Sequence, residues 1–264
     1  MDLQLTGRVA LVSGSTAGIG YAIAEALARE GARVILNGRT QVRVAEARAR
    51  IRAAVPDAQV DGLAADLGTA EGVKVLLAVY PEVDILVNNL GIFEPKAFED
   101  IGDEDWQRMF EVNVMSGVRL SRHYLKTMRR NNWGRIVFIS SESGANTPAE
   151  MVHYGMSKSA QLAVARGLAE SVAGTGITVN SILPGPTRTE GVSAFFGKLA
   201  AEQGVSLAEA ERRFFAEARP SSLLKRFIDP AEVASLVAYV CSPLASATTG
   251  AALRAEGGIL RSIV

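Results

Sequence analysis

Short apolar runs alternate with helical stretches along the whole chain, and this alternation constrains the fold more than any other feature. The helical stretches are residues 20–30, 42–55 and 103–130, which are amphipathic or rich in Ala, Arg and Glu. The β-branched runs predict buried strands at residues 8–12, 33–37, 58–65, 84–89, 135–140, 177–182 and 251–255. Strands that alternate with helices form a parallel sheet with helices on both faces. No linker or repeat interrupts the pattern, so we expect one doubly wound α/β domain over residues 1–264.

Residues 186–229 break this rhythm because they contain no strand pattern. Their charges and apolar positions predict two short amphipathic helices inserted before the last strand, and insertions of this kind are often functional. The segment holds five of the nine phenylalanines of the chain, which are Phe195, Phe196, Phe214, Phe215 and Phe227.

The charge balance and the cysteine content exclude several classes of function. Lys+Arg and Asp+Glu both number 28, which argues against a nucleic-acid binder or an acidic-membrane binder. The single cysteine, Cys241, cannot form an intramolecular disulfide and fits a reducing compartment. The N-terminus has no signal-peptide pattern, and no apolar run approaches the ~18 residues of a membrane helix. We therefore expect a soluble, cytoplasmic protein.

A glycine-rich turn, "SGSTAGIG", joins the first predicted strand to the first helix. Gly14, Gly18 and Gly20 allow a tight turn and let backbone N–H groups approach a pyrophosphate at the helix N-terminus. The spacing is G-x-x-x-G-x-G, and a glycine loop alone is weak support for a dinucleotide site. Its position between a strand and a helix strengthens the interpretation.

The end of the second strand decides which dinucleotide would fit. A carboxylate there favours the 2′-hydroxyl of NAD, and an arginine favours the 2′-phosphate of NADP. The chain reads "ILNGRT", so Asn37 and Arg39 favour NADP over NAD. A solvated arginine in an Asn-Gly turn is the alternative. Asp66 and Leu67, after the third strand, are candidates to flank the adenine, although Asp66 could instead cap the next helix.

Tyr154 and Lys158 lie four residues apart in "YGMSK", within a stretch that has no proline from residue 149 to 183. On a helix this spacing places both side chains on one face. A free phenol has a pKa of about 10, too high for an efficient base at neutral pH. A neighbouring ammonium favours the phenolate and lowers that pKa.

The chain resembles the short-chain dehydrogenase/reductase family, because six motifs occur in the family's order. They are the glycine loop, "NNLG" at 88–91, Asn113, "ISSESG" at 139–144, "YGMSK" at 154–158 and "LPGPTRT" at 183–189. The resemblance implies a Rossmann-type, seven-stranded parallel sheet. Two positions depart from the family pattern: Ser13 replaces a threonine, and Leu90 replaces a small residue near the nicotinamide.

The resemblance also implies a role for each catalytic candidate. Tyr154 is the acid/base, Lys158 lowers the pKa of Tyr154 and holds the nicotinamide ribose, and Ser141 orients the substrate oxygen. Asn113 holds a water near the lysine and extends a proton relay, although packing or capping is an alternative role. Ser140, next to Ser141, is expected to point to the other side of the strand end.

Further cofactor-binding residues follow from the same motifs. Thr187, through its backbone, and Thr189, through its hydroxyl, are candidates to meet the carboxamide, and loop capping is their alternative role. The remaining candidates are Ser15, Thr16, Ile19, Asn89, Gly91, Pro184 and Gly185.

The family match assigns residues 190–227 to a substrate lid. The phenylalanines there indicate either an apolar substrate or a lid pinned to the core, and the sequence does not decide between them. The C-terminal "RAEGGILRSIV" resembles the tail that joins subunits, which implies a homotetramer or a homodimer.

The sequence thus predicts an NADP-preferring oxidoreductase acting on a ketone, aldehyde, 3-oxoacyl compound or secondary alcohol. A dinucleotide-binding regulatory protein without turnover is one alternative, and a dehydratase or epimerase on the same fold is another. His153, Glu142 and Glu94 lie near the motifs, but we expect His153 to flank the site and either glutamate to be solvated or to meet a polar substrate group. Two distant histidines and one cysteine give no metal site.

Overall fold

The computed structural model describes residues 1–263 and contains a seven-stranded, fully parallel sheet in the order β3-β2-β1-β4-β5-β6-β7. The strands are β1 (Val9–Val12), β2 (Arg33–Gly38), β3 (Val60–Ala64), β4 (Ile85–Asn88), β5 (Gly134–Ile139), β6 (Ile177–Pro184) and β7 (Ala252–Ala255). All seven predicted strands are present, with ends that differ by at most two residues. The predicted Rossmann-type α/β fold is therefore confirmed.

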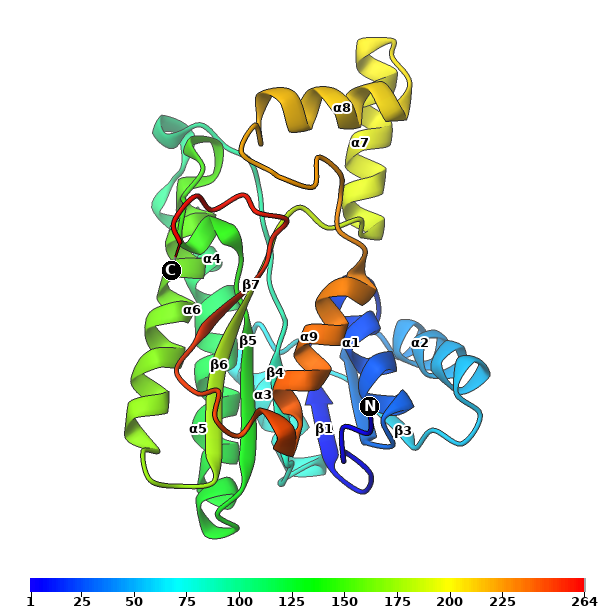
Figure 1. Ribbon diagram of the computed structural model, residues 1–264, viewed down its shortest axis with the longest axis vertical. Coiled ribbons are helices and arrows are strands. Elements are labelled where there is room, and N and C mark those ends of the chain that lie inside the picture. The colour runs from blue at the N-terminus through cyan, green and yellow to red at the C-terminus, as the bar shows by residue number, and fades with distance from the viewer. Residues whose placement is uncertain (264) are drawn as a thin grey trace.

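Helices cover both faces of this sheet (Figure 1). One face carries α1 (Gly18–Arg29), α2 (Gln41–Ala54) and α9 (Pro230–Cys241), and the other carries α3 (Ala70–Val79), α5 (Ser116–Arg130) and α6 (Val152–Ser171). The strands alternate between the two cores. Ala10 and Val12 of β1 pack with the α1 and α9 side, whereas Leu11 packs with the α3 and α5 side. This two-sided burial explains why the strands are continuously apolar.

The sequence pattern did not indicate α3 and α9 as helices. Both are strongly apolar, and α9 begins with a capping box in which Asp229 accepts from Ala231 and Glu232 accepts from the N–H of Asp229. Short 3₁₀ turns complete the chain at Phe98–Asp100, Glu142–Gly144, Ala149–Met151 and Pro243–Ala245. Among residues 1–263, no helix has the length and apolarity that a membrane span requires.

The predicted long helix at 103–130 is interrupted in the middle. It consists of α4 (Asp103–Phe110), a π-helical segment (Glu111–Met115) and α5. Asn113 lies in the π segment, which shifts the local hydrogen-bond pattern of the helix. Such π segments occur mostly at functional sites.

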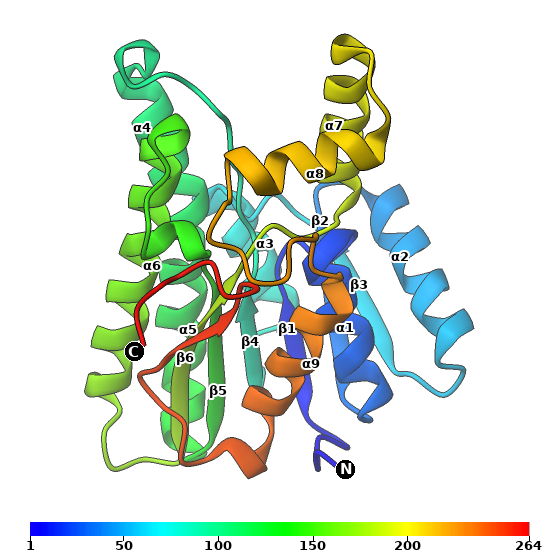
Figure 2. The ribbon, with the colours of Figure 1, turned by 45° about the horizontal axis from the view of Figure 1, so that its top comes forward.

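The helical insertion, residues 186–229, contains the two predicted helices, α7 (Glu190–Gln203) and α8 (Leu207–Glu217). Both stand above the end of the sheet where the parallel strands finish (Figure 2). Phe196, Phe215 and Phe227 are at most 5% exposed and pack against one another and Phe214, with ring centroids 4.9–5.6 Å apart. Four of the five phenylalanines therefore form the core of the insertion, and only Phe195 is half exposed.

Candidate active site

The glycine loop turns from β1 into the N-terminus of α1. Gly14 and Gly18 have φ of +61° and +56°, a conformation that glycine adopts without strain. Ala17 precedes the helix and offers no side-chain cap, so the first N–H groups of α1 lack a side-chain acceptor. A side chain at Gly20 would collide with Asn89 and with the Gly14 carbonyl, and Ile19 packs against the core. This arrangement fits an anion such as a pyrophosphate.

Asn89 and Ser13 join the "NNLG" segment to the glycine loop. The Ser13 hydroxyl accepts hydrogen bonds from the N–H groups of Asn89 and Leu90 at 2.9 and 3.0 Å. The Asn89 amide donates to the carbonyls of Ser13 and Gly14 at 2.9 and 3.0 Å. The Ser13 hydroxyl thus holds the start of the "NNLG" segment, and the Asn89 side chain holds the glycine loop.

Asn37 and Ser15 also support the loop from within. Asn37 is 2% exposed, accepts from the Gly14 N–H and donates to the carbonyls of Leu63 and Ala65. The Ser15 hydroxyl is buried, donates to the Val12 carbonyl and accepts from the Asn37 N–H. Both polar side chains are fully engaged inside the protein, so they shape the binding loop instead of facing a ligand.

Arg39 lies just after β2 and is exposed. Within residues 1–263 its guanidinium makes no hydrogen bond or ion pair. Thr16 packs against Gly38, where a Cβ would lie only 2.5 Å from the threonine methyl. The free arginine and the close backbone approach are the features expected of a site for a 2′-phosphate.

Asp66 and Leu67 follow β3 at the same edge of the sheet. Asp66 is exposed and accepts from the Gly68 N–H at 3.0 Å. It does not cap the following helix, since Thr69 is the N-cap of α3 and accepts from the Gly72 N–H. Leu67 is 1% exposed and belongs to the core, which leaves its backbone to face a ligand.

Ser141, Tyr154 and Lys158 come together where β5 ends and α6 begins. The Lys158 ammonium lies 5.6 Å from the centroid of the Tyr154 ring, as expected for two side chains one helical turn apart. The Ser141 side chain lies near enough to the Tyr154 phenol to oppose the rise in its pKa. Ser140 instead donates to the Lys158 carbonyl at 2.9 Å and points away from the site.

The electrostatics of this group differ from the expectation. Burial, followed by the negative charge of Glu142, raises the pKa of Tyr154 well above its ordinary value, against a weaker opposing effect of Ser141. The predicted lowering by Lys158 was therefore wrong for this structure. Burial also lowers the pKa of Lys158 to about 8. A sequence does not show desolvation, which dominates both groups.

Asn113 reaches Lys158 through Gln161. The Asn113 side chain accepts from the Ile92 N–H at 2.7 Å and donates to Ser157 Oγ at 2.9 Å. The Asn113 carbonyl accepts from Gln161 Nε2 at 2.6 Å, and Lys158 Nζ donates to Gln161 Oε1 at 3.2 Å. The Gln161 side chain thus links the Asn113 carbonyl to the Lys158 ammonium, and the water that the family resemblance implies near Asn113 stays a prediction. Gln161 lies three residues after Lys158, so helical spacing could have indicated it.

The remaining cofactor candidates surround the same edge. A Cβ on Gly91 would lie 3.3 Å from Lys158 Nζ, so the glycine keeps space beside the ammonium. A Cβ on Gly185 would lie 2.6 Å from the Glu256 carbonyl, next to the buried Pro184. Thr187 is buried and donates to the Gly185 carbonyl. Thr189 caps α7 by accepting from the Val192 N–H and contacts the glycine loop at Gly18.

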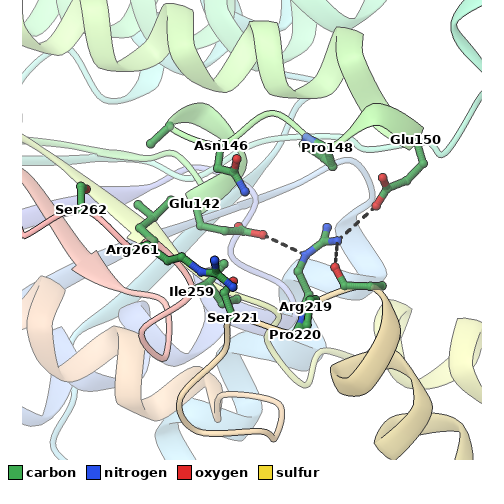
Figure 3. Close-up of a pocket in the computed structure, with 13 residues that line it drawn as sticks. Glu142, Asn146, Pro148, Glu150, Arg219, Pro220, Ser221, Ile259, Arg261 and Ser262 are labelled. Carbon is green, nitrogen blue, oxygen red and sulfur yellow. Dashed lines mark hydrogen bonds and ion pairs between the residues drawn. The ribbon is translucent and has the colours of Figure 1, made fainter.

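A cleft of about 580 Å³ opens between the loop after β5, the end of the helical insertion and the C-terminal tail. Glu142 and Arg219 form its inner wall, 3.6 Å apart, with side chains 8% and 14% exposed (Figure 3). Arg219 also pairs with Glu150 at 3.2 Å. None of the phenylalanines of the insertion lines this cleft.

Glu142 and Arg219 are residues that the sequence reasoning did not assign to the site. Glu142 was expected to be solvated or to meet a polar substrate group, and it is buried. Its partner is distant in the sequence, so no local pattern could indicate the pair.

Two residues near the site, His153 and Glu94, contact neighbouring side chains. His153 is 1% exposed and packs edge to face on Trp106, with centroids 5.9 Å apart. Glu94 is half exposed and lies 3.9 Å from Arg108. His153 therefore flanks the site without facing it.

Comparison with known proteins gives a consistent family assignment. The family model described as "short chain dehydrogenase" matches residues 8–198. The Bacillus subtilis protein named "Uncharacterized oxidoreductase YvaG" is 50% identical over 263 residues and covers all of both chains. The 3-oxoacyl-[acyl-carrier-protein] reductase FabG of Aquifex aeolicus is 34% identical and covers 98% of this chain and 100% of its own.

Among solved structures, L-sorbose reductase from Gluconobacter frateurii, complexed with NADPH and L-sorbose, superimposes with a TM-score of 0.93. It is 31% identical and covers all of both chains. The similarity includes the sheet, the helices on both faces and the helical insertion, since no part of either chain is left out.

Proposed function

Because the chain belongs to the short-chain dehydrogenase/reductase family, and so to the NAD(P)-dependent oxidoreductases, we propose that it reduces a ketone or aldehyde with NADPH. The observation that carries this proposal is the meeting of Ser141, Tyr154 and Lys158 at the carboxyl edge of the sheet. Ligands of open α/β sheets bind at this edge. A regulatory protein without turnover would not need a matched acid and oxygen-binding hydroxyl.

Tyr154 is the proposed proton donor. Burial and the Glu142 carboxylate raise the pKa of its phenol, so the phenol is protonated at neutral pH. When bound, the reduced nicotinamide supplies a hydride to the carbonyl carbon. Tyr154 gives its proton to the carbonyl oxygen, which yields the alcohol and the oxidised cofactor. The phenol is thus in the protonated form that a proton donor requires.

Ser141 and Lys158 support that transfer. The Ser141 hydroxyl would donate to the substrate oxygen and fix its position near the phenol. Lys158 Nζ donates hydrogen bonds to the Ile139 carbonyl at 2.9 Å and to Gln161 Oε1 at 3.2 Å. After Tyr154 has lost its proton, the Lys158 ammonium balances the negative charge of the phenolate. The Asn113 carbonyl accepts a hydrogen bond from Gln161 and so fixes the side chain that holds the Lys158 ammonium.

NADPH is the proposed cofactor because of Arg39. The exposed, unpaired guanidinium at the end of β2 suits a phosphate, and that end of β2 carries no carboxylate for a ribose hydroxyl. The L-sorbose reductase was solved with NADPH, which supports the same choice. Gly14, Gly18 and the N-terminus of α1 would hold the pyrophosphate.

The helical insertion is the proposed substrate lid. It stands over the carboxyl edge, and its phenylalanines hold α7 and α8 together as a unit (Figure 2). We also propose a single 264-residue domain in the cytoplasm. The homotetramer implied by the C-terminal tail stays a prediction.

The proposal is tested by cofactor oxidation. The purified protein would be given NADPH or NADH together with a panel of ketones, aldehydes and 3-oxoacyl thioesters. The proposal expects carbonyl-dependent oxidation of NADPH in preference to NADH. Tight NADPH binding without oxidation by any carbonyl would instead favour the regulatory alternative.

A further inference from the structure

Glu142 links the candidate catalytic serine to the helical insertion through its two carboxylate oxygens. Oε2 accepts the hydrogen of the Ser141 hydroxyl, and Oε1 lies 3.6 Å from Nε of Arg219. The residue is 6% exposed and begins the 3₁₀ turn Glu142–Gly144 directly after Ser141. A buried carboxylate therefore faces the point where the substrate carbonyl must bind.

The Ser141 hydroxyl has only one hydrogen to donate. In this structure that hydrogen goes to Glu142, while Ser141 Oγ accepts from the Ser143 N–H at 3.1 Å. When a substrate carbonyl takes the hydrogen, Oε2 of Glu142 loses its donor. Leaving a buried acceptor without a partner destabilises the complex, and more so when the acceptor is charged.

Within residues 1–263, no other group donates a hydrogen bond to Oε2 of Glu142. The Tyr154 phenol is committed to the substrate oxygen as the proton donor. Arg219 is held on the other carboxylate oxygen, where it also pairs with Glu150 and donates to the Ala218 carbonyl (Figure 3). A substrate that takes the Ser141 hydrogen can itself supply the missing donor to Oε2 of Glu142.

The position of that donor follows from the shared serine. Two acceptors that bond to the same Oγ lie within about 5 Å of each other. A hydroxyl on the carbon next to the substrate carbonyl spans this interval and can donate to Oε2. Ser141 and Tyr154 do not line the cleft, so Glu142 is the residue that connects the Ser141 hydroxyl to it. The space beside Glu142 suits a polar occupant, because Arg219 and Arg261 also line it and the phenylalanines of the insertion do not.

We infer that Glu142 is a specificity-determining residue that accepts a hydrogen bond from a hydroxyl adjacent to the reacting carbonyl, so that the substrate is an α-hydroxy ketone. This inference rests on the proposed carbonyl reduction. Arg219 positions the carboxylate by holding Oε1. A ketone without this hydroxyl leaves the buried carboxylate of Glu142 without a donor, so the site should favour the α-hydroxy ketone over it.

The test compares three small ketones with NADPH and the wild-type protein. Hydroxyacetone carries the donor, butanone has the same size without it, and methoxyacetone keeps the electron withdrawal but has no donor. We expect kcat/KM for hydroxyacetone to exceed both others by about 100-fold or more. Similar values for all three ketones would overturn the inference and leave the proposed reduction standing.

The same ratios are then measured in two variants. Glu142→Gln replaces the carboxylate by a neutral amide, whose oxygen is a weaker acceptor and whose NH₂ group cannot accept, so the preference for hydroxyacetone should fall by about tenfold or more. Glu150→Gln is the matched control, because it removes the other carboxylate that pairs with Arg219, and it should keep the preference. NADPH affinity, measured by fluorescence, shows that each variant is folded.

The remaining outcomes are also decisive. A preference that persists in Glu142→Gln, or that falls equally in Glu150→Gln, would overturn the assignment to Glu142. NADPH oxidation with none of these ketones and with no other carbonyl of the wider panel would overturn the proposed function itself, and the inference with it.

Discussion

Replacing Lys158 by methionine should change how the stability of the protein depends on pH. Lys158 is 4% exposed, and burial lowers its pKa from 10.5 to about 8 in the folded chain. In the unfolded chain the pKa returns to its ordinary value. Between pH 8 and 10.5 the unfolded chain therefore binds more protons than the folded chain, so the free energy of unfolding rises with pH.

The size of this effect follows from the two pKa values. The full shift of about 2.5 units corresponds to about 3 kcal/mol, which is the penalty for keeping the buried ammonium charged. From pH 7 to pH 9 the linkage relation gives a gain of about 1.3 kcal/mol for the wild type over Lys158→Met. The hydrogen bonds from Lys158 to Ile139 and Gln161 contribute an offset that is largely constant with pH.

Denaturant unfolding at pH 7, 8 and 9, at one protein concentration and without cofactor, measures the difference. Lys198→Met is the matched control, because the Lys198 side chain is 79% exposed and its removal should give no such trend. A wild-type minus Lys158→Met difference that stays flat or falls with pH would refute the claim that Lys158 is a buried, strained charge.

Three further predictions concern the cofactor, the relay and the insertion. Arg39→Ala should raise the KM for NADPH about tenfold or more and leave that for NADH unchanged, and an equal loss with both cofactors would contradict the 2′-phosphate assignment. Gln161→Leu removes an acceptor of the Lys158 ammonium, so the alkaline limb of the kcat–pH profile should move to lower pH, whereas a loss of kcat with no shift would indicate packing alone. Phe196→Ala removes a buried ring from the core of the insertion, which typically lowers the free energy of unfolding by about 3–5 kcal/mol. The variant should have a higher KM for the ketone and an unchanged affinity for NADPH, and an unchanged KM would argue against the insertion as a lid.

The sheet could be predicted because its strands carry their own signal. Each strand is buried on both faces, so it reads as an uninterrupted apolar run between helical stretches. α3 was missed because its apolar residues are nearly as dense as those of a strand. The π segment at Asn113 was missed because the apolar periodicity of residues 103–130 does not show where the backbone hydrogen-bond pattern shifts. In the structure, Gln161 donates a hydrogen bond to the carbonyl of Asn113 in this segment.

The positions of the site residues could be predicted from the sequence more readily than the shifts of their pKa values. Helical spacing placed Tyr154 and Lys158 together, and the resemblance to the family assigned Ser141 to the same site. The predicted direction of the Tyr154 pKa shift was wrong because burial and the Glu142 carboxylate raise this pKa, and only Ser141 opposes them. Arg219 could not be predicted, because only the folded insertion brings it to Glu142.

The most direct test of the central claim is carbonyl-dependent oxidation of NADPH by the wild type and by Tyr154→Phe, together with NADPH affinity for both. We expect the variant to keep its affinity and lose turnover by about 100-fold or more, because it lacks only the proton that the substrate oxygen needs. Turnover that survives in Tyr154→Phe would contradict the assignment of Tyr154 as the acid.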